Sequence, residues 1–320
     1  MRFKSDLPIL AVLALAISCG SFAAPVESES DAMGRATAAN KAKDYATSMA
    51  IYRKLADAGS AAAPAMIGIL YFAGAGVPRD NTKACDLFAI SEKRGDPNGT
   101  ELLADCFFKG EGRTQNYAQS AHLYEAASAR GVTTADCALG NQYLNGLGVQ
   151  KDETKAAALC RKSAERGVAN AQTDLGQMYF MGQGVQKNLT EAAGWFRKAA
   201  DQGSANAAFI LGTMYWNGDG VERDHEQAGK RWYQSALQGN ASAPARLAKY
   251  YFGRSLTPDK QILVDAASKT AYWATLAARA DPNPSIKTDS QKLVDLLLNA
   301  APNLKPQVET MLAASTPPSF

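Results

Sequence analysis

Apolar, small and aromatic positions recur along this chain with a period of 36 residues. Each unit has a large apolar residue at position 8, a small residue at position 9 and an aromatic residue at position 12. These positions share one face of a helix with 3.6 residues per turn. The residues at position 8 are Ile67, Leu103, Leu139, Leu175 and Leu211. We therefore expect each unit to begin with an amphipathic helix, called helix A.

Two glycines at positions 15 and 17 follow helix A in five consecutive units. Because glycine adopts positive φ at little cost, such a pair ends a helix and turns the chain. An Asp or Asn then stands at position 21, where its side chain can cap a second helix, helix B. Helix B is expected to end at the glycines that recur at position 36, which are Gly59, Gly95, Gly131, Gly167, Gly203 and Gly239.

The repeat also predicts the domain organisation. We expect an all-α fold, a right-handed α-solenoid of about six two-helix repeats of 36 residues with capping helices at both ends. The expected repeats are 60–95, 96–131, 132–167, 168–203, 204–239 and 240–281, the last with an insertion around 255–269. The caps are expected at 24–59, with helices at 31–40 and 45–58, and at 282–320, with helices at 290–300 and 305–313 and a disordered tail.

Two motifs of the repeat resemble the Sel-one-like repeat family, a relative of the tetratricopeptide repeats. The pattern A-x-x-W-F-x-K-A-A-x-x-G occurs at 192–203, and L-G-x-M-Y-x-x-G-x-G-V occurs at 175–185 and at 211–221. The resemblance covers roughly residues 40–281, and the second unit departs from it at Arg113, where the other units have valine. The resemblance implies a protein that binds other proteins, with helix A lining the concave side of the array.

The N-terminal segment 1–23 has the features of a secretory signal. Arg2 and Lys4 precede an apolar stretch at 7–17 that is too short to cross a bilayer, and the small residues Ser21 and Ala23 offer a cleavage site. A lipoprotein signal that is cut before Cys19 is the alternative. We therefore expect a periplasmic or secreted protein, or one that is anchored to lipid at Cys19, and no transmembrane segment.

Four cysteines remain after signal cleavage, an even number in an oxidising compartment: Cys85, Cys106, Cys137 and Cys160. Four cysteines allow three pairings, and four buried free thiols are the alternative to any of them. Helix geometry favours one of these pairings.

The heights of the cysteines along their helices match in sequential pairs. Cys85 lies ten residues before Gly95 and Cys106 eleven residues after it, so both are about 15–16 Å from the turn. Cys137 and Cys160 each lie eight residues from the ends of the turn between them. We therefore predict Cys85–Cys106 and Cys137–Cys160 disulfides, each contributing ~3 kcal/mol by the chain-entropy argument. Matched height is necessary for a disulfide but does not fix the direction of the side chains.

The charge balance and the motifs limit the chemistry. The chain has 34 basic and 31 acidic side chains, and removing 1–23 leaves 32 and 30, with no basic cluster, so we expect no nucleic-acid partner. No C-x-x-C, H-E-x-x-H or Ser-x-x-Lys motif occurs, and the Gly-x-Gly pairs lack the lysine of a phosphate loop. We interpret His122 and His225 as surface or packing residues. We expect no catalytic residues, no cofactor and no metal.

Positions 10 and 14 of helix A differ from unit to unit, whereas the structural positions keep the same residue types. Binding positions of a repeat array vary in this way. We therefore expect partner binding at Ile69, Asp105, Asn141, Gln177, Thr213 and Lys249 of position 10, and at Lys109, Asn145, Met181 and Asn217 of position 14. A merely solvated face is the alternative. The aromatic column at position 12 is expected to pack in the core, and a stacking platform for a base or a sugar is the alternative.

These features favour a non-enzymatic scaffold or adaptor of the bacterial cell envelope that binds another protein or peptide on its concave face. The resemblance is compatible with a regulator, a host-contact factor or a partner that neutralises a toxin. It also leaves two alternatives, a cysteine-rich hydrolase that acts on β-lactams and a lipid-anchored assembly factor of the envelope. Of these, the hydrolase lacks a recognisable nucleophile and base in the sequence.

Overall fold

The computed structural model describes residues 27–255, 263–314 and 317–320, and in these residues it contains sixteen helices and no strand. None of the described helices is both long and apolar enough to cross a membrane. The helices are α1 (Glu29–Lys41), α2 (Tyr45–Asp57), α3 (Ala63–Ala73), α4 (Asn81–Lys93), α5 (Pro97–Lys109), α6 (Tyr117–Ala129), α7 (Thr133–Asn145), α8 (Glu153–Glu165), α9 (Ala169–Met181), α10 (Leu189–Asp201), α11 (Ala205–Asn217), α12 (His225–Leu237), α13 (Ala243–Phe252), α14 (Val264–Ala280), α15 (Pro284–Ala300) and α16 (Leu304–Ala313).

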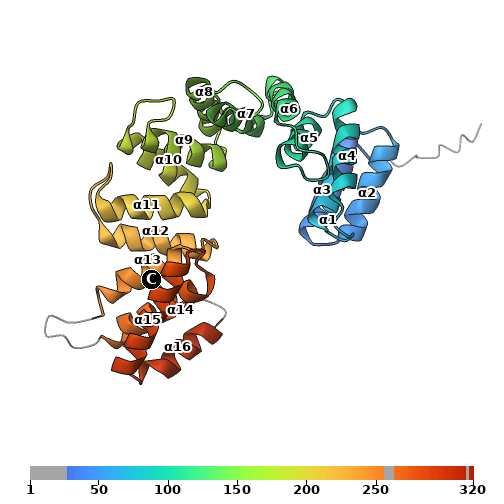
Figure 1. Ribbon diagram of the computed structural model, residues 1–320. Coiled ribbons are helices and arrows are strands. Elements are labelled where there is room, and N and C mark those ends of the chain that lie inside the picture. The colour runs from blue at the N-terminus through green and yellow to red at the C-terminus, as the bar shows by residue number, and fades with distance from the viewer. Residues whose placement is uncertain (1–26, 256–262, 315–316) are drawn as a thin grey trace, which may run out of the picture.

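Consecutive helices pack on one another to form a curved array (Figure 1). The odd-numbered helices α3 to α11 are helices A of the expected units, and the even-numbered helices α4 to α12 are helices B. At the bend, α5 and α7 lie on the inside and α6 and α8 on the outside. We call the surface formed by α3, α5, α7, α9, α11 and α13 the inner face. The fold is thus the all-α solenoid that the sequence predicts.

The cap residues of helix B act as expected. All five side chains at position 21 accept a hydrogen bond from a backbone N–H in the first turn of helix B, with distances of 2.8 to 3.1 Å. Each cap satisfies a donor that the helix itself leaves free. The side chains are those of Asp80, Asn116, Asp152, Asn188 and Asp224.

The two glycines of each turn serve different purposes. The first, such as Gly182 with φ +77°, ends helix A in the left-handed conformation. The second lies against the preceding unit. A Cβ on Gly184 would lie 1.8 Å from the carbonyl oxygen of Glu153, at the start of α8. The second glycine is therefore needed for the approach of one unit to the next as well as for the turn itself.

The small residue at position 9 makes room for the large residue at position 29 of the same unit. A Cβ on Gly212 would lie 2.7 Å from the ring of Trp232, and one on Gly176 would lie 2.9 Å from the ring of Phe196. Both rings are almost completely buried. In these two units the contact closes the hairpin of helix A and helix B, because a residue without a side chain lets the ring reach the backbone.

The C-terminal cap differs from the sequence expectation in two respects. The helix expected at 290–300 begins earlier, at Pro284, because Asn283 caps it by accepting from the Ser285 N–H at 2.9 Å. The expectation of a disordered tail is wrong for its last residue. Phe320 stacks on Tyr250 with ring centroids 5.4 Å apart, over the space that Gly229 leaves open.

Replacing Gly184 by alanine is expected to destabilise the array more than replacing Gly167. Both glycines have positive φ, so each substitution costs about 1–2 kcal/mol of backbone strain. Only Gly184 has backbone within 2 Å of the new Cβ, whereas Gly167 has nothing within 4 Å. The clash adds about 1–3 kcal/mol. Urea unfolding of the two variants measures the difference, and equal losses of stability would contradict this account of inter-unit packing.

Candidate functional site

A mostly apolar hollow lies on the inner face between α3 and α5. It has a volume of about 330 Å³, and we call it the apolar hollow. Ile69 and Phe72 of α3 and Leu102 of α5 line its walls, with Phe88 of α4 beside them. Ile69 is 36% exposed although it is a large aliphatic residue. The remaining lining residues are Ala73, Asp105, Cys106 and Lys109.

The polar rim of the apolar hollow is an ion pair that is open to solvent. Lys109 Nζ lies 2.9 Å from Asp105 Oδ2, one turn apart on α5. The other carboxylate oxygen of Asp105 accepts a hydrogen bond from the hydroxyl of Tyr124 on α6. Burial, with the nearby Asp105 carboxylate, raises the pKa of Tyr124, so that hydroxyl remains a donor at neutral pH. These contacts hold the charges of Asp105 and Lys109 at the edge of the apolar hollow, so its walls consist of apolar side chains.

A second hollow, with polar walls, lies further along the inner face, where α9, α11 and the start of α13 meet. It has a volume of about 420 Å³, and we call it the polar hollow. Two amides on its wall bind each other, with Asn240 Nδ2 donating to Asn206 Oδ1 at 3.2 Å. The other lining residues are Thr173, Asp174, Gln177, Phe209, Ile210 and Ser242. The inner face therefore offers an apolar site and a polar site in one continuous array.

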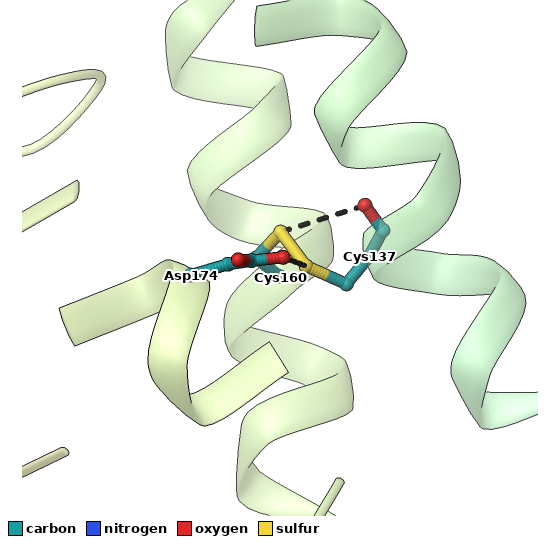
Figure 2. A group of neighbouring side chains, drawn as sticks. All are labelled: Cys137, Cys160 and Asp174. Atoms are coloured by element: carbon teal, nitrogen blue, oxygen red, sulfur yellow. Dashed lines mark hydrogen bonds between the residues drawn. A yellow bond between two sulfur atoms is a disulfide. The ribbon is translucent and has the colours of Figure 1, made fainter. Parts of the chain in front are cut away.

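Asp174 lies between the polar hollow and a disulfide (Figure 2). Its Oδ2 atom accepts a hydrogen bond from Asn141 Nδ2 at 2.9 Å and lies 3.5 Å from Cys137 Sγ. Burial raises the pKa of Asp174, and the hydrogen bond from Asn141 opposes this effect. Cys137, Cys160 and Asp174 are the only group in the described residues with the types and spacing of metal ligands. Because the two sulfurs are joined in a disulfide, they offer no thiolate to a metal.

Both disulfides are the ones that the helix heights predict. Cys85 of α4 is joined to Cys106 of α5, with Cα atoms 6.2 Å apart, so this disulfide links one unit to the next. Cys137 of α7 is joined to Cys160 of α8, with Cα atoms 4.1 Å apart, so this one closes a single unit. All four cysteines are buried. The second disulfide lies under the inner face beside Asp174, and the first contributes Cys106 to the apolar hollow.

Some of the residues expected to bind a partner lie in the two hollows. Ile69, Asp105 and Lys109 line the apolar hollow, and Gln177 lines the polar hollow. Asn141 lies beside the polar hollow and holds Asp174. Five of the ten expected residues thus lie in or beside the hollows, and partner binding by these residues remains a prediction.

The other expected residues have different surroundings. Thr213 accepts a hydrogen bond from Trp232 Nε1 at 3.4 Å and donates to a backbone carbonyl of its own helix. Asn145 and Asn217 make hydrogen bonds near the ends of their own helices A. Met181 and Lys249 are exposed and line neither hollow. These five residues are therefore outside the candidate site.

Position 7 of helix A supplies wall residues that the sequence analysis missed. Leu102 lines the apolar hollow, and Asp174 and Ile210 line the polar hollow. This column varies from unit to unit as positions 10 and 14 do, so the same criterion would have found it. Positions 7, 10 and 14 fall close to one another on a helix, since they are separated by three and four residues.

The aromatic column at position 12 packs against the core, as expected: Tyr71 is buried, and the other four rings are partly buried against the core. Tyr143 and Tyr179 keep part of their surface exposed. Cations cover them: Lys155 Nζ lies 4.1 Å from the centroid of Tyr143, and Arg161 donates to the Tyr179 hydroxyl at 2.6 Å. The occupied rings do not favour a stacking platform for a base or a sugar.

Comparison with known proteins identifies the repeat. A sequence model of the Sel1 repeat matches residues 61–96, 99–132, 134–168, 169–204 and 205–240, more than half of the chain. The matched repeats end before most of the expected sixth unit, which contains α13 and α14. No curated protein matches the chain in sequence.

Several solved structures are similar to this one. A Sel1 repeat protein from Oxalobacter formigenes has 25% identity and a TM-score of 0.67, and the match covers 78% of this chain and 100% of that chain. A Sel1 repeat protein from Klebsiella pneumoniae has 21% identity and a TM-score of 0.46, covering 62% and 97%. The immunity protein Pa5087 from Pseudomonas aeruginosa has 18% identity and a TM-score of 0.43, covering 72% and 81%.

Removing either disulfide is expected to lower the free energy of unfolding by about 3 kcal/mol, because each closes a loop of similar length. The sequence separations are 21 and 23 residues. The paired substitutions Cys85→Ala with Cys106→Ala, and Cys137→Ala with Cys160→Ala, test this by urea unfolding. Mass mapping of a non-reduced digest is the control, and a peptide that joins Cys106 to Cys137 would disprove the pairing.

Proposed function

The chain belongs to the Sel1 repeat family, and we propose that it is a non-enzymatic scaffold of the bacterial cell envelope that binds a segment of another protein along its inner face. Proteins built from this repeat are generally interaction scaffolds rather than enzymes. The observation that carries the proposal is the apolar hollow, a cavity of about 330 Å³ with an apolar wall and a charged rim on the inner face.

The apolar hollow has the features of a pocket for a side chain. Its walls are the side chains of Ile69, Phe72 and Leu102, which a folded protein would otherwise bury. Burying one leucine or phenylalanine of a partner there contributes about 1.5–3 kcal/mol. The Asp105–Lys109 pair at the rim offers both a hydrogen-bond acceptor and donors to the backbone of the bound segment.

The polar hollow adds hydrogen-bonding capacity to the same face. An extended protein segment presents unpaired N–H and C=O groups that need partners when they are buried. The side-chain amides of Gln177, Asn206 and Asn240 can both donate and accept, so they suit a backbone of any sequence. The apolar side chain of a partner would supply most of the binding free energy. Hydrogen bonds to these amides would fix the position of the bound segment along the inner face.

A location outside the cytoplasm is supported by the disulfides. Two disulfides are typical of proteins in oxidising compartments. The signal expected at 1–23, and Cys19 as the possible site of a lipid anchor, lie outside the described residues. Because the four cysteines of the described part of the chain are joined in pairs, none of them is a free thiol nucleophile for the hydrolase alternative.

The substitution Ile69→Glu is expected to abolish capture of the partner, because it places a carboxylate in the apolar hollow. Ile90→Glu is the matched control, since Ile90 is 41% exposed on the adjacent helix α4 and lines neither hollow. The measurement is the set of proteins that each immobilised variant retains from an envelope extract, with unfolding curves to show that both variants fold. If Ile69→Glu retains the same proteins as the unmodified chain, the proposed role of the hollow fails.

A further inference from the structure

The carboxylate of Asp174 has no cationic partner in the described part of the chain. No lysine or arginine nitrogen there lies within 4.0 Å of it, and its Oδ2 atom accepts a hydrogen bond from the neutral amide of Asn141. The buried Asp136, by contrast, lies 2.8 Å from Lys162 Nζ. Asp174 differs from Asp136 in having no counter-charge, and it differs from the buried Asp96 and Asp281 in lining a hollow of the inner face.

The partly buried carboxylate of Asp174 is unfavourable for the free energy of the unbound protein. Withdrawing a carboxylate from water is unfavourable unless it is paired with a cation or fully hydrogen-bonded. Its raised pKa comes from burial, and no charged side chain contributes to that shift. Arg246 approaches the same region, where its guanidinium lies 6.0 Å from the ring centroid of Phe209, but it makes no ion pair with Asp174. The hollow is thus left with an uncompensated negative charge.

The walls around Asp174 suit a long cationic side chain. The hollow has a volume of about 420 Å³ and combines amide and hydroxyl groups with the apolar surfaces of Phe209 and Ile210. Lysine and arginine side chains have an apolar stem and a charged head, so they fit a site with apolar walls and an acid at one side. The amide oxygens of Asn206 and Gln177 can accept hydrogen bonds from those N–H groups of the cationic head that do not bind the carboxylate.

We propose that the polar hollow binds a lysine or arginine side chain of the partner's segment, with Asp174 as its counter-ion. This inference rests on the proposed function and deepens it, because it gives the partner a definite chemistry. The bound segment presents an apolar residue to the apolar hollow and a basic residue to the polar hollow. In this account Asp174 contacts the partner directly, and Asn141 holds the carboxylate of Asp174 in position.

The test uses a minimal probe, N-acetyl-arginine amide, and its uncharged analogue N-acetyl-citrulline amide. Each is titrated into the full-length chain, and NMR follows the side-chain amides of Asn206, Asn240 and Gln177. We expect the arginine probe to shift these signals and to bind about tenfold or more tightly than the citrulline probe, because a charge-assisted hydrogen bond is stronger than a neutral one. Equal binding of the two probes would overturn the proposal.

Two variants separate a specific contact from a general effect of charge. Asp174→Asn keeps the shape of the side chain and is expected to weaken binding of the arginine probe about tenfold. Asp57→Asn removes an exposed carboxylate of α2 and is expected to leave binding unchanged. Unchanged binding in Asp174→Asn, or an equal loss in Asp57→Asn, would disprove the assignment.

A further readout separates binding from a structural role of Asp174. Because the carboxylate lacks a counter-ion, Asp174→Asn is expected to keep or raise the midpoint of thermal unfolding, and a lowered midpoint would count against the proposal. The outcomes also separate the two levels of the account. If the arginine probe binds but Ile69→Glu does not affect partner capture, the proposed function alone is refuted. If Ile69→Glu abolishes capture but the arginine probe does not bind, only this inference is refuted.

Discussion

The contact between the turn of one unit and helix B of the preceding unit is the constraint on which the array depends. Gly184 and the equivalent Gly112, Gly148 and Gly220 bring backbone against backbone, with no side chain between them, whereas Gly76 of the first unit lies against the side chain of Tyr45. A rigid contact of this kind, repeated at the same place in each unit, holds successive helices A next to one another. Contacts between neighbouring units are therefore sufficient to form the inner face, and no contact between units distant in the sequence is required.

The scaffold leaves particular positions free to carry function. Positions 8, 9 and 29 close the hairpins, and positions 17 and 21 set the turn and the next helix, so these positions have structural roles. Positions 7, 10 and 14 share the remaining surface of helix A, where one unit can offer Leu102 and another Asp174. The two hollows differ in chemistry because these positions hold different residues on an otherwise similar backbone.

The disulfides and the inner face are physically connected. Cys106 lines the apolar hollow, and Cys137 lies against Asp174 beside the polar hollow. The Cys85–Cys106 link restrains α4 and α5, which supply walls of the apolar hollow, and this lowers the entropy lost when a partner binds. The Cys137–Cys160 link restrains α7, whose Asn141 holds the carboxylate of Asp174. In this account, the oxidising compartment matters for binding as well as for stability.

The sequence predicted the helices, caps and turns because each depends on residues close in the chain, such as Asp80 and the lysine three residues later. It predicted the disulfides because height along a helix follows from residue number. It did not predict the polar hollow, since Asp174, Asn206 and Asn240 come from different units and meet only when the units stack. It also missed the packing of Phe320 on Tyr250, which depends on the fold of the whole C-terminal cap.

Site-specific photo-crosslinking tests the central claim most directly. A photoreactive amino acid is placed at position 102 or 210 of the inner face, or at the exposed positions 90 and 237 on helices B. The account predicts that the same partner protein is crosslinked from both inner positions and from neither position on helices B. Crosslinks from 90 or 237, with none from 102 and 210, would show that a partner binds elsewhere on the array.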